Sequence, residues 1–458
     1  MSLSSSLSIA LRALLADQGA MSVVSNNIAN VNTPGYSREV PVFQEDPPVA
    51  YGNLLFGTGV DLSTIQAVRD NVLQLRLNQE AQSQGKLDTF NTGMTQIQVL
   101  FNEPAGAGLQ GLISQFFSSF QQLSADPTNL GLRQSVISNA ESLAAGFRQT
   151  AAALNTQQKS ADQGVVQTVG QINQITSQIA ALNEQISAPS VSDQNANSLV
   201  DQRNLLVNQL SQLVDVQSIT ADGTSLTLTT SNGTALVVGG ISFPLTTQTN
   251  SGTGFQHIFA QGVDITSSIT GGNLAGDLQL RDEEIPALQN SLDTLASGLA
   301  NNVNTQHLAG FDLSGVAGTN FFVPPAGVAG AALNLQVAIT DPTKVAASAD
   351  GTPGDNTNAT ALANLQNQNI IGGQTPINFY SGLIFQVGND TANSSAQLSA
   401  EKLLIQQLQD QQNAVSGVSL DQEAANLVQF QTAFNAAARV ASIVASLFQT
   451  TINMGAGA

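Results

Sequence analysis

The sequence predicts a mainly α-helical protein, in which a long helical rod or bundle carries coiled-coil helices at both termini and a small inserted antiparallel β domain. Three observations lead to this prediction. Apolar residues follow heptad spacing at both ends of the chain, and a longer heptad seam runs through residues 137–186. Short runs of alternating polar and apolar residues, separated by turn residues, begin near Val216. Heptad spacing indicates packed helices, and alternation indicates strands.

The first predicted helix covers Leu3 to Val31. Its seam steps alternately by four and three residues, with Asp17 as an acidic exception. The apolar seam residues are Leu3, Leu7, Ala10, Leu14, Met21, Val24, Ile28 and Val31. A stripe this narrow does not stabilise a lone helix in water, so a partner is expected to cover it. The C-terminal helix of the same chain is one candidate for that partner.

The last predicted helix starts at Leu420 and carries two apolar stripes. One stripe consists of Leu420, Ala424, Leu427, Gln431, Phe434, Ala438, Ala441, Ala445, Phe448 and Ile452. The other consists of Phe430, Ala433, Ala437, Val440, Val444, Leu447 and Met454. Two stripes indicate a helix that is covered on more than one side, and the many small residues let neighbouring helices approach closely. We therefore expect this helix to lie inside an assembly.

An intramolecular hairpin of the two terminal helices, or a simple dimer, is the alternative. Two-stranded coiled coils usually place charged residues at the e and g positions, where they set the choice of partner. Between Ala424 and Ala458 the only charged residue is Arg439. This lack of charge argues against the simpler pairing without excluding it.

The first interior helix is predicted from near Ser63 to Leu100. Its apolar face carries Ile65, Val68 and Val72. A short apolar helix is expected over residues 109–123, and further helices are expected over residues 199–214, 282–304 and 376–415.

The longest helix is predicted to begin at Asp126-Pro127, where the aspartate supplies an N-cap and the proline the first helical position. Its seam alternates steps of three and four residues until Pro189 ends the helix. The seam residues are Ile137, Ala140, Ala144, Phe147, Ala151, Leu154, Gln158, Ala161, Val165, Thr168, Ile172, Ile175, Ile179, Leu182 and Ile186. A helix of this length measures ~90 Å, which makes the domain a rod.

A small β domain is predicted at residues 216–275, where Asp222-Gly223 and Asn232-Gly233 are hairpin turns between short strands. Residues 311–355 are rich in Gly, Ala, Asp and Pro and are expected to be irregular, with a strand near Leu333 to Ile339. The predicted organisation comprises terminal assembly helices with a linker at 1–60 and 416–458, a helical rod domain at 61–215, 276–310 and 356–415, the β domain at 216–275, and an irregular or β connecting segment at 311–355.

Composition excludes several classes of function. The 458 residues include 13 Lys and Arg against 32 Asp and Glu, a net charge of −19, with no Cys and 2 His. A groove for a polyanion needs clustered basic residues, so nucleic acid is not an expected partner. Zinc sites, disulfides and cysteine nucleophiles lack their ligands or thiols, so we expect no metal and no cofactor. Only 10% of the residues are charged, which favours surfaces that pack against other protein.

Neither end of the chain resembles a membrane address. Residues 1–20 lack an early positive charge and place Arg12 within the apolar stretch, unlike a cleavable signal peptide. The most apolar C-terminal stretch is interrupted by Asn435, Arg439 and Ser442, whereas a membrane span needs roughly 18 uninterrupted apolar residues. We expect no transmembrane segment, no membrane partner, and export without an ordinary signal peptide.

No motif forms a catalytic constellation. Residues 106–111 match G-x-G-x-x-G, but they follow a predicted helix and lack the acidic residue that a dinucleotide site requires, so a helix–helix turn is expected. Asp282, Glu283 and Glu284 are better explained as the first turn of a helix, where the macrodipole favours negative charge, than as acids acting on a glycan. His307 is expected to be a structural hydrogen-bonding residue. We expect no enzymatic activity.

The segment from Asn26 to Arg38, NNIANVNTPGYSR, is more specific than a helix stop requires. It resembles the N-terminal signature of bacterial flagellar rod, hook and hook-associated proteins. Four further blocks narrow the resemblance: SLVDQRNLLVNQL at 198–210, NTQHLAGFD with two phenylalanines at 304–322, ITDPTKVAAS with PGDNTNATALANLQ at 339–366, and SGVSLDQEAANLVQFQTAFNAAARV at 416–440. With these blocks the chain resembles, over essentially its whole length, the family of flagellar hook-associated protein 1, the first hook–filament junction protein.

The resemblance implies a structural component of the bacterial flagellum that is extracellular, reaches that place through flagellar type III export, and is needed for filament assembly and motility. Members form a ring at the end of the hook, between the flagellar hook protein and a second hook–filament junction protein. A flagellar export chaperone would hold the C-terminal segment. The paired terminal helices would self-assemble into the ring or helical oligomer, mobile in the free monomer and ordered on polymerisation.

The resemblance also implies an assembly interface on both terminal helices and on the signature. In the N-terminal part it would comprise Leu3, Leu7, Leu14, Met21, Val24, Asn26, Asn27, Ile28, Asn30, Pro34, Gly35 and Tyr36. In the C-terminal helix it would comprise Leu420, Leu427, Phe430, Phe434, Val440, Val444, Phe448 and Ile452. Some family members carry a further β domain before the ITDP block. Here residues 323–338 alone separate that block from Phe322, so a smaller outer surface is expected.

Other functions remain open at this point. A secreted adhesin would bind through the β region at 216–275, and another flagellar axial protein, of the hook or the rod, would share the N-terminal signature. A peptidoglycan hydrolase would need Glu283 and Glu284 paired in a cleft.

Overall fold

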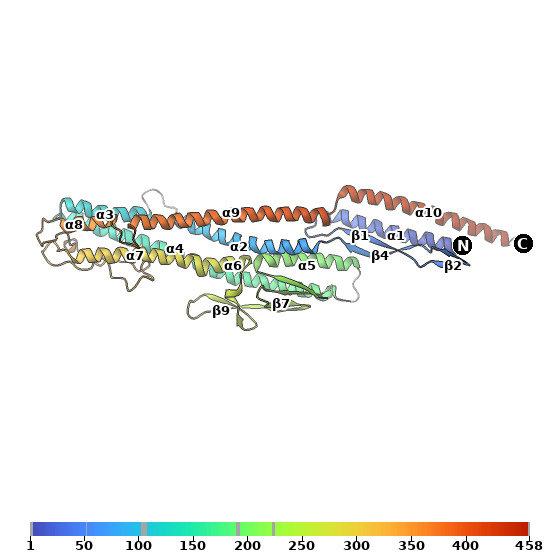
Figure 1. The fold of residues 1–458 in the computed structure, drawn as a ribbon, viewed down its shortest axis with the longest axis horizontal. Coiled ribbons are helices and arrows are strands. Elements are labelled where there is room, and N and C mark those ends of the chain that lie inside the picture. The colour runs from blue at the N-terminus through green and yellow to red at the C-terminus, as the bar shows by residue number, and fades with distance from the viewer. Residues whose placement is uncertain (1–2, 52, 102–107, 189–192, 222–224, 457–458) are drawn as a thin grey trace.

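The computed structural model describes residues 3–51, 53–101, 108–188, 193–221 and 225–456. The molecule is elongated, with its long helices along one axis, both termini at one end, and a group of strands on one side near the middle (Figure 1). The predicted mainly α fold with paired terminal helices and inserted antiparallel strands is confirmed.

The elements follow in chain order. The helices are α1 (Leu3–Ala29), α2 (Asn71–Phe101), α3 (Leu109–Ala125), α4 (Leu130–Ile186), α5 (Asp193–Leu213), α6 (Gly272–Gln279), α7 (Ile285–Leu308), α8 (Thr357–Asn364), α9 (Pro376–Ser416) and α10 (Leu420–Ala456). The strands are β1 (Glu39–Glu45), β2 (Val49–Tyr51), β3 (Leu54–Phe56), β4 (Val60–Ala67), β5 (Gln217–Ala221), β6 (Ser225–Thr229), β7 (Ala235–Val238), β8 (Ile241–Ser242), β9 (Leu245–Thr249), β10 (Gln256–Ala260) and β11 (Val263–Asp264).

One end of the molecule is a unit that we call the terminal module, made of α1, β1–β4 and α10. α1 and α10 pack along each other and run in opposite directions (Figure 1). β1 and β4 pair antiparallel and lie on α1, and β2 and β3 form a second hairpin. Arg12 of α1 forms ion pairs with Asp46 and Asp61, which fixes the strands to the helix.

The predicted helix start near Ser63 is wrong, because β4 occupies residues 60–67 and α2 begins at Asn71. Side chains along β4 pass between half-buried and exposed positions with nearly the period of two that a strand shows. The helix is capped later by Asp70, whose Oδ1 accepts the backbone N–H groups of Val72 and Leu73, each at 3.0 Å. Ile65 and Val68 have helical spacing by coincidence.

α4 forms the axis of the helical rod. The predicted seam is buried from Ile137 through Ile172 and again at Ile179. Ile175, Leu182 and Ile186 are half-buried, because Thr176 and Asn183 take the buried positions beside them. The predicted start at Asp126-Pro127 is wrong by a few residues. Asn129 has an extended backbone and caps the helix, its Oδ1 accepting Gly131 N–H at 2.9 Å and Leu132 N–H at 3.2 Å. Asp126 ends α3 instead, donating its N–H to the Leu123 carbonyl.

Two large hydrophobic cores and a small cluster of Leu73, Leu77, Ile405 and Leu408 stabilise the described part of the helical rod. The larger core joins α2, α3, α4, α7, α8 and α9 at the end of the rod that lies away from the termini. Its centre is a cluster of phenylalanine rings with centroids 5.1–5.8 Å apart, formed by Phe116, Phe117, Phe120, Phe321 and Phe322. The smaller core lies where α4, α5 and α6 meet the inner faces of the β sheets.

The strands of the β region form two antiparallel sheets, with orders β5-β6-β7-β8 and β9-β10-β11. The predicted turn at Asn232-Gly233 is confirmed, and Gly233 has a φ of +86° that favours glycine. The predicted turn at Asp222-Gly223 lies outside the described residues.

The predicted strand near Leu333 to Ile339 is wrong, because only an isolated bridge from Val337 to Phe322 forms there. Asp293 holds the preceding residues in a turn by accepting the N–H groups of Gly330 and Ala332.

Candidate assembly surface

The inner faces of α1 and α10 cover each other. On α1 the buried residues are Ala10, Ala16, Ala20, Val23, Val24 and Asn27, whereas the predicted seam residues Leu3, Leu7, Leu14, Met21 and Ile28 are half-buried. On α10 Val444 is buried, while Leu427, Phe430, Phe434 and Phe448 are half-buried. Small alanines at the contact let the helix axes approach closely. The chain therefore covers part of its N-terminal seam with its own C-terminal helix.

The outer faces of the same helices carry apolar and small polar residues. Along α1 the exposed positions again alternate steps of four and three, and they are Ser4, Ser8, Leu11, Leu15, Gln18, Ser22, Ser25 and Ala29. None of these side chains is charged. Along α10 the exposed apolar residues are Leu420, Val428, Val440, Ile443, Leu447, Ile452 and Met454. Two charged side chains, Asp421 in the first turn and Arg439 beside Val440, are also exposed on α10. We call the two sets of exposed uncharged residues, on α1 and on α10, the uncharged outer face.

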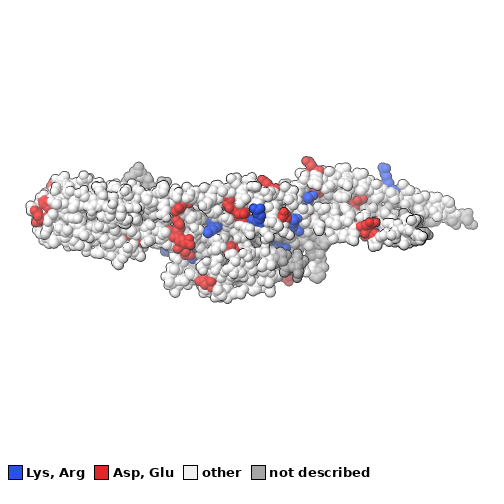
Figure 2. All heavy atoms as spheres, viewed as in Figure 1, with Lys and Arg blue, Asp and Glu red and all other residues white. Residues whose placement is uncertain are grey.

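Of the predicted interface residues on α10, Leu420, Val440 and Ile452 belong to the uncharged outer face. The others lie on the inner face or at its margin. Figure 2 shows few coloured side chains over the terminal helices on the face that it draws. By length and composition α1 is also apolar enough to cross a membrane, yet it packs on α10, β1 and β4. The expectation of no membrane partner stays a prediction.

The signature residues form hydrogen bonds that join α1, β1 and α10 in the terminal module. Asn27 is buried, and its side chain forms hydrogen bonds with the backbone N–H and carbonyl of Glu39 at 2.9 and 2.8 Å. The same amide donates to the carboxylate of Glu423 on α10 at 3.2 Å. The Tyr36 hydroxyl donates to Asn27 Oδ1 at 2.8 Å. Burial, together with the nearby carboxylates of Glu39, Asp201 and Glu423, raises the pKa of Tyr36, so its hydroxyl remains a donor.

The remaining signature residues shape the loop that follows α1. Asn30 donates from Nδ2 to the carbonyl and Oδ1 of Asn26, both at 3.0 Å, which closes the end of the helix. Gly35 has a φ of +79°, a left-handed conformation that favours glycine. The loop with Pro34 and Gly35 lies against α5, where a Cβ on Gly35 would stand 3.5 Å from Leu205 Cβ. The structure thus gives the predicted signature residues an intramolecular role.

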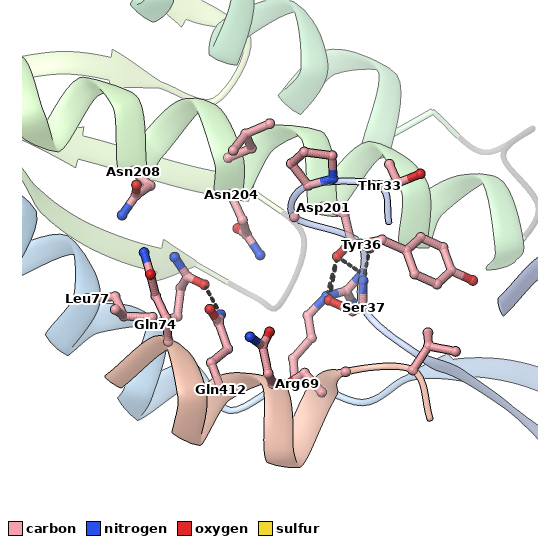
Figure 3. A pocket seen from close by; sticks show the side chains of 18 of the residues that line it. Thr33, Tyr36, Ser37, Arg69, Gln74, Leu77, Asp201, Asn204, Asn208 and Gln412 are labelled. Carbon is pink, nitrogen blue, oxygen red and sulfur yellow. Dashed lines mark hydrogen bonds and ion pairs between the residues drawn. The ribbon is translucent and has the colours of Figure 1, made fainter. Parts of the chain in front are cut away.

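A polar cavity of about 410 Å³ lies where the terminal module meets the helical rod. Figure 3 shows its lining from the signature loop, α2, α5 and α9. Asp201 of α5 binds both Ser37 and Arg69 at one side of it. Sequence reasoning did not predict these contacts. In a chain with few charged residues, an aspartate within the 198–210 block could have indicated an ion pair or a buried hydrogen-bond acceptor.

The 304–322 block organises the far end of the rod. Asn304 accepts the N–H groups of Phe321 and Phe322 at 2.8 Å, and donates to the Phe322 carbonyl at 2.9 Å. His307 bonds through Nδ1 to the Thr319 carbonyl at 2.6 Å and accepts Ala346 N–H through Nε2 at 2.8 Å. Burial lowers the pKa of His307 to about 4. The predicted structural role of His307 is confirmed.

The acidic run at 282–284 does not start a helix, which corrects the prediction. A π-helical turn at 280–284 joins α6 to α7, so the backbone N–H groups there are already bonded within a continuous helix. Asp282 instead pairs with the buried Arg281, at 2.8 Å. Burial and then the charges of Asp390 and Glu283 raise the pKa of Glu284. Among the described residues, no cluster of three or more His, Asp or Glu side chains is placed to hold a metal ion.

Comparison with known proteins decides the family. Residues 94–322, half of the chain, match the model of the flagellar hook-associated protein FlgK helical domain. The chain belongs to the FlgK family of flagellar hook-associated proteins. Residues 7–36 also match the flagella basal body rod protein model, which agrees with an N-terminal signature shared among axial proteins.

FlgK-family relatives match over nearly the full chain. The chain is 28% identical to flagellar hook-associated protein 1 of Salmonella typhimurium over 553 residues, covering 99% of this chain and 100% of the relative. It is 29% identical to that of Bacillus subtilis over 500 residues, covering 98% of each. The solved structure of the flagellar hook junction protein FlgK from Burkholderia pseudomallei has the same fold, with a TM-score of 0.68, 20% identity, and coverage of 74% of this chain and 100% of that one.

Membership of the FlgK family confirms the predicted function class. The chain is a structural component of the hook–filament junction in the extracellular flagellum, and it is not an enzyme. As a flagellar axial protein it assembles with other flagellar components.

Proposed function

We propose that this FlgK-family chain self-assembles into a ring or helical oligomer through its paired terminal helices. The observation that carries the proposal is the uncharged outer face, which exposes Leu, Ile, Val and Met side chains in a chain of net charge −19. Full burial of one such side chain stabilises a contact by about 1.5–3 kcal/mol. Beyond the first turn of α10, Arg439 is the only exposed charge among these side chains, so little charge would have to be desolvated when helices of neighbouring subunits pack closely.

The proposal assigns a neighbour to each side of the oligomer. The flagellar hook protein lies on one side and the second hook–filament junction protein on the other. Before assembly, a flagellar export chaperone binds the C-terminal segment. Support for the chaperone comes from α10, because exposed apolar residues such as Ile443 and Met454 need cover in a soluble chain.

Assembly in this proposal also stabilises the terminal helices, which are paired in the free monomer. Their inner contacts include several alanines, which bury little apolar area per residue, so the pair is expected to open more often than the rod. Amide hydrogen exchange on purified monomer tests this point by comparing residues 3–29 and 420–454 with the seam of α4. Exchange at both ends that is faster than in α4, yet slower than in an unfolded chain, is the expected result. Equal protection would mean that the packed pair is already stable before assembly.

Removal of the terminal helices tests the proposal itself. A chain limited to residues 68–416 retains both large cores and is expected to remain soluble and helical by circular dichroism. In cells whose own copy is deleted, this chain is expected to support no filament. Fully flagellated, motile cells that carry only the truncated chain would refute assembly through these helices.

A further inference from the structure

The terminal module joins the helical rod through few covalent and packing links. The chain crosses between them twice, from β4 to α2 at residues 68–70 and from α9 to α10 at residues 417–419. Among the helices and strands, β4 and α5 pack across this junction. The signature loop, residues 30–38, also rests on α5, where Gly35 approaches Leu205. We call this region the module junction.

One buried carboxylate, that of Asp201 on α5, binds both the signature loop and the segment between β4 and α2 at the module junction. Asp201 on α5 accepts the backbone N–H of Ser37 at Oδ2 and the Ser37 hydroxyl at Oδ1, each at 2.8 Å. Arg69, between β4 and α2, donates to Asp201 Oδ1 from Nε at 2.9 Å and from its terminal nitrogen at 2.8 Å. Ser37 and Asp201 are only 8% and 7% exposed. Figure 3 shows Ser37 and Arg69 converging on this side chain.

Neighbouring contacts extend the same attachment. Arg69 also donates to the Asn197 carbonyl at 2.8 Å, and the Asn197 side chain donates to the Ile65 carbonyl of β4 at 2.9 Å. One turn of α5 thus holds the end of β4 and the start of α2. Charge-assisted hydrogen bonds of this kind are short and directional, so they fix an orientation more sharply than apolar contact does.

Apart from these contacts and the hydrogen bond from the Arg38 N–H to the Ser416 carbonyl at 2.8 Å, the junction offers little resistance to a change of angle. Nine of the 23 residues that line the cavity of about 410 Å³ beside Asp201 are amides, including Gln74, Asn204, Asn208 and Gln412. Amides exchange partners with water or with one another at small net cost in free energy. A tightly packed apolar contact would have a single geometry, whereas this lining tolerates several.

We propose that Asp201 is a positioning residue that sets the angle between the terminal module and the helical rod. By holding Ser37 and Arg69 together, it determines the direction in which α1 and α10 leave the rod. The significance of that direction for the oligomer rests on the proposed function. The angle itself is a property of the single chain and is measured without assembly.

Distances between spin labels on the full-length chain test the proposal. The natural chain has no cysteine, so introduced cysteines take the labels alone. One pair, Gln18→Cys with Gln178→Cys, spans the junction from α1 to α4, and both positions are exposed. A second pair, Gln18→Cys with Thr432→Cys, lies within the terminal module and reports its integrity.

The decisive variant is Asp201→Asn, which replaces one acceptor oxygen with an amide N–H that faces donors. Asp410→Asn, an exposed change of the same charge on α9, is the matched control. In Asp201→Asn we expect the distribution of cross-junction distances to broaden or shift, and the distance within the terminal module to stay as in the unsubstituted chain. Ser37→Ala keeps the buried ion pair and removes only the hydroxyl bond, so it is expected to produce the same change to a smaller extent.

An unchanged cross-junction distance in Asp201→Asn and in Ser37→Ala would overturn the positioning role. So would a broad cross-junction distance in the unsubstituted chain, because no fixed angle would then exist. If both distance distributions broaden in Asp201→Asn, the substitution has disturbed folding of the terminal module. Ser37→Ala then decides, because a change in its cross-junction distance alone supports positioning and no change overturns it. These outcomes are independent of the truncation experiment, which tests assembly through α1 and α10 whatever the angle between module and rod.

Discussion

Ile443 and Val444 are neighbours on α10 whose side chains point about 100° apart around the helix. One is exposed and the other buried, so substitutions at the two positions distinguish pairing within the chain from assembly between chains. Val444 is 6% exposed and lies on the inner face toward α1, whereas Ile443 is 58% exposed on the uncharged outer face. Ile443→Asp and Val444→Asp introduce the same charge at adjacent positions. The sequence alone places Val444 in the assembly interface, but its burial makes it a probe of the α1–α10 pair.

The two substitutions are expected to differ in magnitude. In the single chain Val444→Asp loses about 1.5–3 kcal/mol of side-chain burial and adds an unpaired buried carboxylate, for a total of roughly 3–5 kcal/mol. Ile443→Asp is expected to change the stability of the single chain by only about 0.5 kcal/mol. In an oligomer that buries this face, the same aspartate costs about 3 kcal/mol per contact, which weakens each contact more than about 100-fold.

Hydrogen exchange and filament counts together provide the assay. Val444→Asp is expected to speed exchange in both α1 and α10, and Ile443→Asp is expected to leave both unchanged while cells lose their filaments. Ile443→Asn, in which the new side chain has the size of aspartate but no charge, is the control and is expected to reduce filament numbers less than Ile443→Asp does. Wild-type filament numbers with Ile443→Asp would refute burial of the outer face, and unchanged α1 exchange with Val444→Asp would refute the inner contact.

Two further predictions concern the helical rod. Gly85→Ala is expected to lower the melting temperature, because a Cβ there would stand 2.0 Å from the Gln212 carbonyl oxygen. Gly170→Ala, with open space around it, is the control and is expected to raise stability by up to about 1 kcal/mol. Equal melting temperatures for the two variants would contradict the contact between α2 and α5. The pKa of His307 is lowered to about 4 in the fold, so its contribution to stability is complete above pH 6.5 and is lost as the pH falls toward 4. Urea unfolding at pH 7 and pH 4.5 should show this loss in the natural chain and a smaller one in His307→Gln.

Helix positions followed from the sequence where a seam could be traced over many turns. The α4 seam is buried as predicted from Ile137 to Ile172, because a rod of this length has no other way to cover its apolar residues. The ends of helices were less certain. Asp70 caps a helix that the apolar pattern would start near Ser63, and Asn129 caps α4 in place of the predicted Asp126, since capping depends on backbone geometry at one residue.

Tertiary contacts limited what could be predicted for the candidate site. Most of the seam of α1 predicted by its heptads is only half-buried, and Ala10 and Val24 are its buried members, because the face toward α10 and the strands is centred on Ala16, Ala20 and Val23. β1–β4 pack there, and short strands with few alternating residues leave a weak signal. The bond between Ser37 and Asp201 joins positions 164 residues apart, and no local pattern reports such a pairing.

In the proposed assembly through the terminal helices, the pairing of α1 with α10 makes completeness of the chain a condition for joining the flagellum. Asn27 and Glu423, which meet in the terminal module, are 396 residues apart. A polypeptide released early, or cut anywhere in between and separated, would present α1 without the helix that completes its face. Under this proposal, damaged copies lack the complete face and fail at the step of incorporation.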